Sequence, residues 1–127
     1  MSKMRLGGIA LDCADPGPLS RFWAALLGGE IVFASEEIAV VKLPHLLLTA
    51  TRVENYVRPN WPIGSVPKQE HIDVDVDDLE DAENRAISFG AARAQWQPDP
   101  DSYLVFLDPA GHPFCLTTQI PDDWQSD

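Results

Sequence analysis

The chain has 127 residues, of which 45% are hydrophobic, and this length is enough for one folded domain with a hydrophobic core. Its net charge is −11, from 20 acidic and 9 basic residues. This charge argues against nucleic acids and anionic membranes as partners, because both are bound by basic surfaces. The chain contains neither an apolar run that could span a bilayer nor the apolar segment of a signal peptide, so we expect a cytoplasmic protein.

The first half of the chain predicts one strand, one helix and three further strands. Residues 6–13 read as the strand, and Asp15-Pro16-Gly17-Pro18 reads as a turn that starts the helix. Apolar residues then follow at the spacing of an amphipathic helix, which ends at Gly28-Gly29. The three apolar runs that come next, each typical of a strand, are residues 30–35, 37–43 and 45–53.

The second half repeats this plan with a constant offset. His71 lies 63 residues after Gly8, and Asp78 lies 63 residues after Asp15. A strand of alternating apolar and acidic residues is followed by a helix that closes on Gly90. Each half therefore predicts a β-α-β-β-β module, and the strands that end the second are residues 91–97, 102–107 and 113–119. We place module one at about 4–54, a proline-rich linker at about 55–68, and module two at about 69–120.

Three segments in this order carry a resemblance to a known family: LDCADPGPLSRFWAALLGG, EHIDVDVDDLEDAENRAISFGA and FLDPAGHPFCL. The sequence resembles the vicinal oxygen chelate superfamily of glyoxalase I, bleomycin-resistance proteins and extradiol dioxygenases, and above all its small bacterial glyoxalase-like domains. The resemblance implies a single α+β domain over residues 1–127. In this fold two βαβββ modules form a curled, incomplete β-barrel with the helices outside.

The resemblance also implies where a metal would bind. Metal-using members of the superfamily take their ligands from the first and fourth strand of each module. His71 matches such a position, but the equivalent position of module one is Gly8, and the last strand has Cys115 there. The remaining position is Leu47 or Thr49. We therefore expect no bound metal and no other cofactor, because His71 is the only matching ligand.

Strand alternation indicates which side chains face the cavity. Ile72, Val74 and Val76 would pack under the helix, so the polar residues between them would point into the cavity. The same rule places Phe114 and Leu116 in the core. Trp61, in the linker, would stack on a ligand. The predicted ligand-binding residues are His71, Asp73, Asp75, Asp12, Cys115, Thr117 and Trp61.

Several of these residues have more than one interpretation. Cys115 beside His71 could form an activated thiolate or half of a site for a soft metal, or it could be a small wall residue. Asp73 and Asp75 could act as general acid and base, bind a cation, face water, or pair with an arginine. The catalytic candidates, if the protein is an enzyme, are thus His71, Asp73 and Asp75. The arginines considered are Arg5, Arg52 and Arg93.

The predictions for the remaining histidine and cysteine concern structure more than chemistry. His112 follows Asp108-Pro109-Ala110-Gly111, so we expect it in a turn between two strands with its imidazole exposed; the alternative is a site role at the rim of the cavity. Cys13 would face the helix and Cys115 the cavity, and the two are therefore not expected to form a disulfide. Trp23 belongs to the apolar stripe of the first helix and is predicted to be core.

Together these features favour a metal-independent small-molecule-binding protein that sequesters a cationic or amphipathic compound, as bleomycin-resistance proteins do. The alternative is a metal-dependent lyase, isomerase or dioxygenase of the same superfamily that uses His71. A third interpretation is a metal-free enzyme with His71 as base beside Asp73 or Asp75. We expect a homodimer, since the superfamily builds its barrels from paired modules within one chain or between two.

Overall fold

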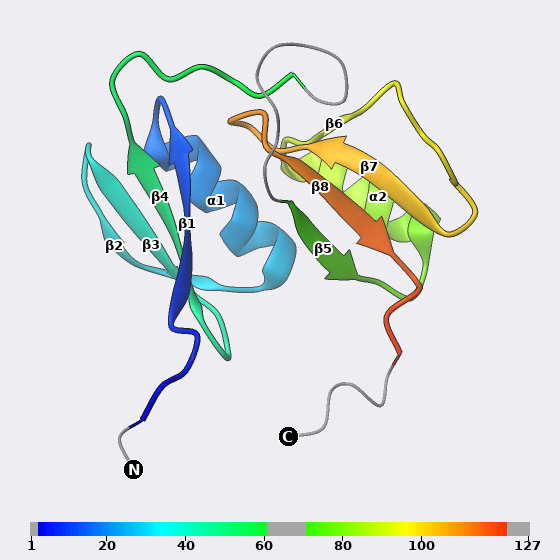
Figure 1. The fold of residues 1–127 in the computed structure, drawn as a ribbon, viewed down its shortest axis with the longest axis horizontal. Coiled ribbons are helices and arrows are strands. Elements are labelled where there is room, and N and C mark those ends of the chain that lie inside the picture. Colours follow the sequence, from blue (N-terminus) through cyan, green and yellow to red (C-terminus); the bar gives the residue numbers. More distant parts are fainter. Residues whose placement is uncertain (1–2, 61–70, 122–127) are drawn as a thin grey trace. The chain divides into compact units, whose positions relative to one another are not determined.

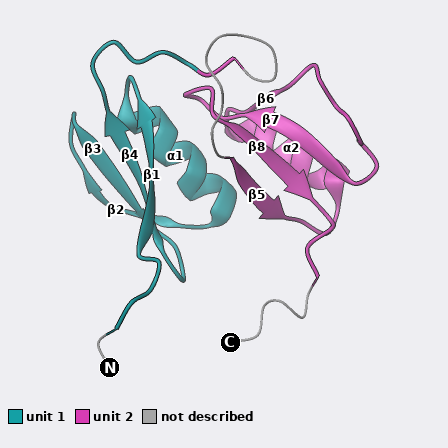
Figure 2. Cartoon of the chain, in the orientation of Figure 1, with its two compact units in different colours: residues 1–58 teal, residues 59–127 magenta. Residues whose placement is uncertain are grey.

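The computed structural model describes residues 3–60 and 71–121. The chain divides into two compact units, residues 1–58 (unit 1) and residues 59–127 (unit 2) (Figure 2). In the described residues each unit contains one helix and one four-stranded sheet. The sequence repeat therefore corresponds to two structural units of the same kind.

Unit 1 begins with β1 (Gly8–Cys13) and α1 (Pro16–Leu27). Its sheet has the order β1-β4-β3-β2, and the helix packs on one face of it (Figure 1). β1 runs parallel to β4, while the other neighbouring strands are antiparallel. The three strands after the helix are β2 (Glu30–Ala34), β3 (Ile38–Lys42) and β4 (Leu47–Arg52).

Unit 2 repeats this topology with β5 (Ile72–Asp75), α2 (Leu79–Phe89) and a sheet of order β5-β8-β7-β6. β5 is parallel to β8, as β1 is to β4. The predicted α+β fold of two βαβββ modules is confirmed. The closing of the two sheets into one incomplete barrel stays a prediction. The strands after α2 are β6 (Ala92–Arg93), β7 (Tyr103–Leu107) and β8 (Pro113–Thr117).

Both helices begin directly after an aspartate of the aligned pair Asp15 and Asp78, and both end at a predicted glycine. The Asp15 side chain accepts a hydrogen bond from the backbone N–H of Gly17, and the Asp78 side chain accepts from Glu80 and Asp81. These contacts satisfy N–H groups that have no partner within the helix. At the other end the chain turns at Gly28, with φ 67°, and at Gly90, with φ 120°. Glycine suits these positions because it has no Cβ to oppose a positive φ.

One predicted strand is much shorter than expected. The strand expected over residues 91–97 is only Ala92–Arg93. The side chain of Gln97 takes over the role of a neighbouring strand, because its amide donates to the Val105 carbonyl and its oxygen accepts from the Val105 N–H. The amide also donates to the Ala94 carbonyl. Beyond β6 the edge of β7 is thus paired by the Gln97 side chain together with the backbone N–H of Ala94, which donates to the same Val105 carbonyl.

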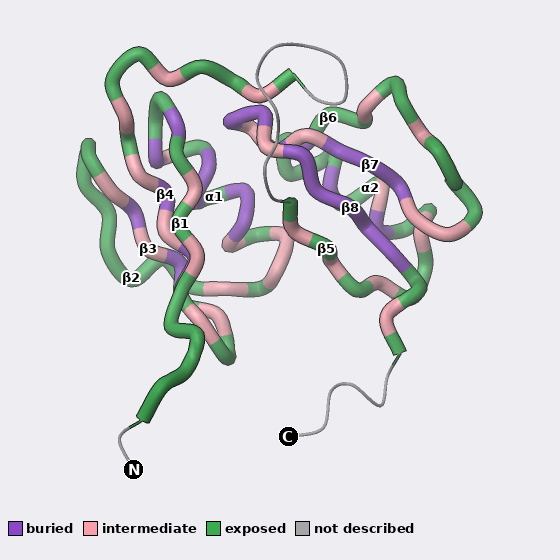
Figure 3. Tube along the Cα trace, in the orientation of Figure 1, coloured by how far each residue is buried: buried purple, intermediate pink, exposed green. Residues whose placement is uncertain are grey.

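The core of each unit lies between its helix and its sheet (Figure 3). Trp23 is fully buried, as predicted, and Phe22 contacts it edge to face. In unit 2 the predicted core residues Phe114 and Leu116 are fully buried, and Phe106 stacks on Phe114. In the described part of the chain, neither helix has the length and apolar character needed to cross a membrane.

The turn before β8 is held by a buried carboxylate. Asp108 is 2% exposed, and its Oδ1 accepts from the backbone N–H groups of Ala110 and His112. Gly111 occupies the turn with φ 89°. His112 therefore stands in the predicted strand-strand turn, which sets the start of β8.

Candidate functional site

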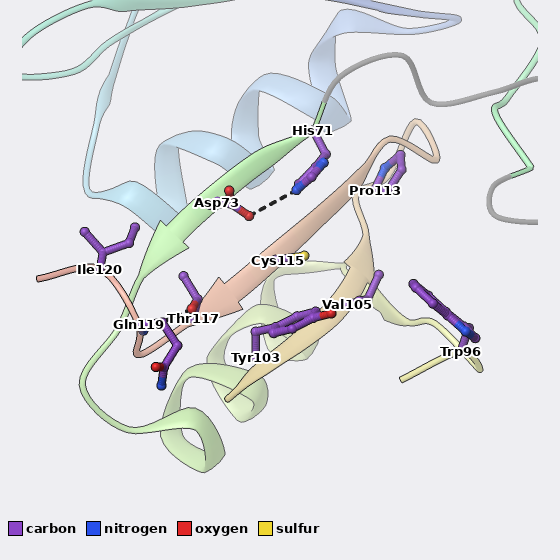
Figure 4. A pocket seen from close by; sticks show the side chains of 10 residues that line it. All are labelled: His71, Asp73, Trp96, Tyr103, Val105, Pro113, Cys115, Thr117, Gln119 and Ile120. Carbon is purple, nitrogen blue, oxygen red and sulfur yellow. Dashed lines mark hydrogen bonds and ion pairs between the residues drawn. The ribbon is translucent and has the colours of Figure 1, made fainter. Parts of the chain in front are cut away.

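A cavity of about 440 Å³ lies in unit 2, on the face of the sheet opposite α2 (Figure 4). Pockets that bind small molecules commonly enclose roughly 300–1,000 Å³. The cavity extends from β5 at one edge of the sheet to the segment after β6 at the other. Its lining residues are His71, Asp73, Trp96, Tyr103, Val105, Pro113, Cys115, Thr117, Gln119 and Ile120.

The polar side of the cavity is built by β5 and β8. These strands pair in parallel with Asp73 opposite Cys115, so both side chains share one face. His71 precedes Asp73 by two residues and lies on the same side. Its Nε2 is 3.2 Å from Asp73 Oδ1 (Figure 4). One donor atom from each of His71, Asp73 and Cys115 lies within 4.8 Å of the other two.

The exposure of these three residues differs. The side chain of Asp73 is 53% exposed and that of His71 is 31% exposed, whereas Cys115 is 8% exposed. The carboxylate and imidazole thus reach solvent while the thiol forms part of the wall. A ligand in the cavity would meet a negative charge beside a hydrogen-bonding ring.

The opposite side of the cavity is aromatic and apolar. β7 pairs with β8 so that Tyr103 is opposite Thr117 and Val105 is opposite Cys115. Trp96 lies beyond β6 and is 44% exposed. Tyr103, Val105 and Trp96 were not among the site residues predicted from the sequence. Alternation along residues 103–107 could have found the first two, but no sequence pattern places Trp96.

The predicted site residues are only partly brought together. His71, Asp73, Cys115 and Thr117 line the cavity. Asp75 is exposed near the end of β5 and is absent from the lining, and Asp12 is exposed in unit 1. Trp61 lies outside the described residues. The functional roles proposed for all seven stay predictions.

Two of the arginines considered as partners of Asp73 and Asp75 pair elsewhere. Arg52 forms an ion pair with Glu37 at 3.6 Å, and Arg93 forms one with Glu83 at 2.6 Å. Asp73 instead has His71 as its neighbour. The negative charge of Asp73 is thus not neutralised by either of these two arginines.

The positions that the resemblance assigns to metal ligands do not form an oxygen-rich metal site. In unit 1 they hold Gly8 and either Leu47 or Thr49, which supply no carboxylate or imidazole. A Cβ added at Gly8 would stand 2.9 Å from the Leu47 carbonyl oxygen, so β4 leaves little room for any side chain there. Hard cations such as Mg²⁺ and Mn²⁺ prefer several oxygen ligands. This set of residues does not supply the several oxygen ligands that such a cation prefers.

Comparison with protein families gives one matching model, described as a glyoxalase-like domain, over residues 8–117. This range includes both helices and all eight strands of the described structure. No curated protein matches the chain.

Solved structures share the fold at low sequence identity. The fosfomycin resistance protein FosX from Mesorhizobium loti has a TM-score of 0.70 and 17% identity, covering 97% of this chain and 98% of its own. A FosX variant from Listeria monocytogenes, complexed with Mn(II) and a dihydroxypropylphosphonic acid, has a TM-score of 0.67 and 12% identity, covering 94% and 93%. The bleomycin-binding protein of Streptomyces verticillus, complexed with copper(II)-bleomycin, has a TM-score of 0.61 and 20% identity, covering 94% and 100%.

Proposed function

The chain belongs to the glyoxalase-like domain family, and we propose that it binds a cationic or amphipathic small molecule in the cavity of unit 2 without a bound metal. The observation that carries the proposal is the division of that cavity into an acidic and an aromatic side. Asp73 and His71 lie at one edge of the sheet, and Tyr103 and Trp96 lie toward the other.

Each side contributes a different part of the recognition. The rings of Trp96 and Tyr103 offer apolar surface and attract cations through their π-electrons. The Asp73 carboxylate favours a positive group, and a net charge of −11 favours the approach of cations from solution. Thr117 and Gln119 add groups that can donate or accept hydrogen bonds. A flat, positively charged molecule would satisfy both sides together.

Fold neighbours support small-molecule binding as a function of this architecture. The Streptomyces verticillus protein is complexed with copper(II)-bleomycin and the Listeria protein with a phosphonic acid. The positions of Gly8 and of Leu47 or Thr49 support recognition without the metal that the family implies. The phosphonic acid in the Listeria complex is anionic. The cavity of this chain contains the Asp73 carboxylate and therefore favours cationic ligands instead.

The proposed function is tested with matched compounds. The EDTA-treated protein would be screened by thermal unfolding against aromatic amines, their neutral analogues and their carboxylic acid analogues. A ligand that binds the native state raises the unfolding temperature. We expect stabilisation by the amines and little by the acids. If the acids stabilise the protein as well as the amines do, the charge preference is wrong.

The rival function is a metal-dependent lyase, isomerase or dioxygenase that uses His71. The observation that favours it is the proximity of Asp73 and Cys115 to His71, because these residues add two donors to the single predicted ligand. Under this alternative the stabilising compounds would bind only after a divalent metal is added. Repeating the screen with and without metal separates the two functions.

We also propose that the protein is a homodimer. The support is the exposed apolar surface of unit 1, where Ile31, Val32 and Phe33 on the edge strand β2 are 37%, 49% and 54% exposed. Surfaces of this kind are commonly covered by a second copy. Light scattering at tens of micromolar protein should give twice the chain mass of 14.0 kDa. A monomer mass would contradict the proposal.

A further inference from the structure

We propose that Cys115 is a nucleophile that adds to aryl-substituted α,β-unsaturated carbonyl compounds in the unit 2 cavity, with His71 as its base. The thiol is part of the cavity wall, and Cys115 is 8% exposed. A ring nitrogen of His71 and a carboxylate oxygen of Asp73 lie within 4.8 Å of the sulfur. The inference goes beyond the proposed function, because the reversible binding of a cation requires no bond to sulfur.

The sheet fixes the position of the sulfur. Cys115 is in the middle of the sheet, since β8 lies between β5 and β7. Asp73 is its partner on β5, and His71 lies on the same side as Asp73 (Figure 4). Hydrogen bonds between a nucleophile and its base are often long before a substrate binds. Rotation of the partly exposed His71 side chain can bring its ring to the sulfur.

The three groups can pass a proton without changing their net charge. A carboxylate beside a neutral imidazole and a thiol carries one negative charge, and so does a carboxylate beside an imidazolium and a thiolate. Asp73 Oδ1, 3.2 Å from His71 Nε2, would stabilise the imidazolium and orient the ring. Asp73 is thus a positioning residue, and His71 is the group that accepts the proton. From β7 the residue opposite Cys115 is the apolar Val105.

The reaction is an addition without a leaving group. The thiol proton passes to His71, and the sulfur electron pair forms a bond to the β-carbon of the ligand. The electrons of the C=C bond move toward the carbonyl oxygen and give an enolate. The α-carbon then takes the proton back from His71. The thiol has been added across the double bond, so the step requires no oxidant, reductant or second reactant.

The lining residues around the sulfur indicate the class of electrophile. Thr117 follows Cys115 by two residues and therefore lies on the same face of β8. Its Oγ1 accepts from the backbone N–H of Gln119, so its own O–H can donate to the carbonyl oxygen of the ligand. Tyr103, opposite Thr117, and Trp96 offer ring surface to an aryl group. An aryl-substituted unsaturated carbonyl compound would use all of these groups.

The chain contains a second thiol that serves as an internal control. Cys13 is 1% exposed in the core of unit 1, and its Sγ donates to the Thr51 carbonyl at 3.5 Å. Trypsin separates the two cysteines, because cleavage after lysine and arginine leaves Cys13 in residues 6–21 and Cys115 in residues 94–127. Mass spectrometry of the digest therefore shows which thiol has reacted.

The test treats reduced, full-length protein in EDTA at pH 7 with N-phenylacrylamide. Intact-mass spectrometry should show the addition of one probe, on Cys115 and not on Cys13. The rate should exceed that of N-acetylcysteine by at least roughly tenfold, because a positioned base assists the addition. The saturated analogue N-phenylpropanamide cannot react, and in excess it should slow the addition by occupying the cavity.

Substitution of the two partners tests their roles. His71→Gln should slow the addition at least roughly tenfold at pH 7, and Asp73→Asn should slow it less. Both differences should narrow above about pH 9, because a cysteine thiol in water ionises near pH 8.5 without a base. The controls His45→Gln and Asp101→Asn alter an exposed imidazole and an exposed carboxylate outside the cavity. They should react like the unmodified protein.

The variant Cys115→Ser should form no adduct, and circular dichroism checks that it is folded. If it unfolds, the digest of the unmodified protein and the rate of His71→Gln still decide. The proposal is overturned if no adduct forms, if Cys13 reacts as fast as Cys115, or if His71→Gln reacts as fast as His45→Gln. None of these results bears on cation binding, which is measured with amines in the absence of an electrophile.

Discussion

The two units share a topology but fill their cores in opposite ways. In unit 1 the helix supplies the buried aromatic side chains, Phe22 and Trp23, and the sheet supplies smaller ones, which are Ala39, Val41, Leu48 and Ala50. In unit 2 the buried residues of α2 are alanines, and the bulk comes from the strands. The buried strand residues of that core are Leu104, Phe106, Phe114 and Leu116. The same fold can therefore take its large core side chains from the helix or from the sheet, provided that the volume between the two is filled.

The units differ in chemistry as well as in packing. On the face away from the helix, unit 2 carries the imidazole, carboxylate and thiol of the cavity. Gly8 and Ala10 hold the positions in unit 1 that the repeat aligns with His71 and Asp73. The duplicated architecture thus carries the imidazole and the thiol in one copy alone.

The largest effect should come from removing the bulk of α1. Replacing Trp23, which is fully buried, with alanine should lower the free energy of unfolding by about 3–5 kcal/mol. Phe89→Ala at the end of α2 is the contrast, because Phe89 is 38% exposed, and it should cost under about 1 kcal/mol. Urea unfolding followed by circular dichroism measures both. Equal losses would show that the cores are not packed in opposite ways.

A smaller effect is expected where a side chain replaces strand pairing in unit 2. Gln97→Ala leaves the Val105 N–H without its partner, while the Val105 carbonyl keeps the hydrogen bond from the Ala94 N–H, and this should cost about 1–3 kcal/mol. The neighbouring exposed Gln95 provides a matched control, and Gln95→Ala should leave stability nearly unchanged. A Gln97→Ala variant as stable as Gln95→Ala would mean that water satisfies the edge of β7 equally well.

The smallest effect concerns the two aligned helix caps. Asp15→Ala and Asp78→Ala should each cost about 1 kcal/mol. The loss should be greater for Asp78, because its side chain accepts two backbone N–H groups and Asp15 accepts one. Asparagine at either position retains the acceptor and should restore most of the stability. If Asp15→Ala and Asp78→Ala lower the free energy of unfolding equally, the second hydrogen bond at Asp78 contributes little.

Much of the fold could be predicted from the sequence because its signals are local and repeated. Asp15 and Asp78 identify both helix starts, and Gly28 and Gly90 identify both ends. The length of β6 could not be predicted, since the apolar and aromatic residues around it give no sign that the Gln97 side chain would pair with Val105. That contact joins residues eight positions apart and depends on tertiary structure.

The candidate site was predicted less completely than the fold. Alternation placed His71, Asp73, Cys115 and Thr117 on one face, and the cavity contains all four. The same rule gave equal weight to Asp75, because it does not tell how far the cavity extends along a strand. Trp96 was missed because it follows the two-residue strand β6, where no alternation remains to indicate direction.

The most direct test of metal-free recognition by unit 2 is a calorimetric titration in EDTA. The titrant is an aromatic amine that the thermal screen identifies. We predict binding to the unmodified protein and to Asp101→Asn, and an affinity about three- to tenfold lower for Asp73→Asn, since the half-exposed carboxylate makes a modest charge contribution. Trp96→Ala should weaken the same ligand through loss of ring contact. If the amine binds Asp73→Asn and Trp96→Ala as tightly as the unmodified protein, or binds only after metal is added, metal-free binding in this cavity is contradicted.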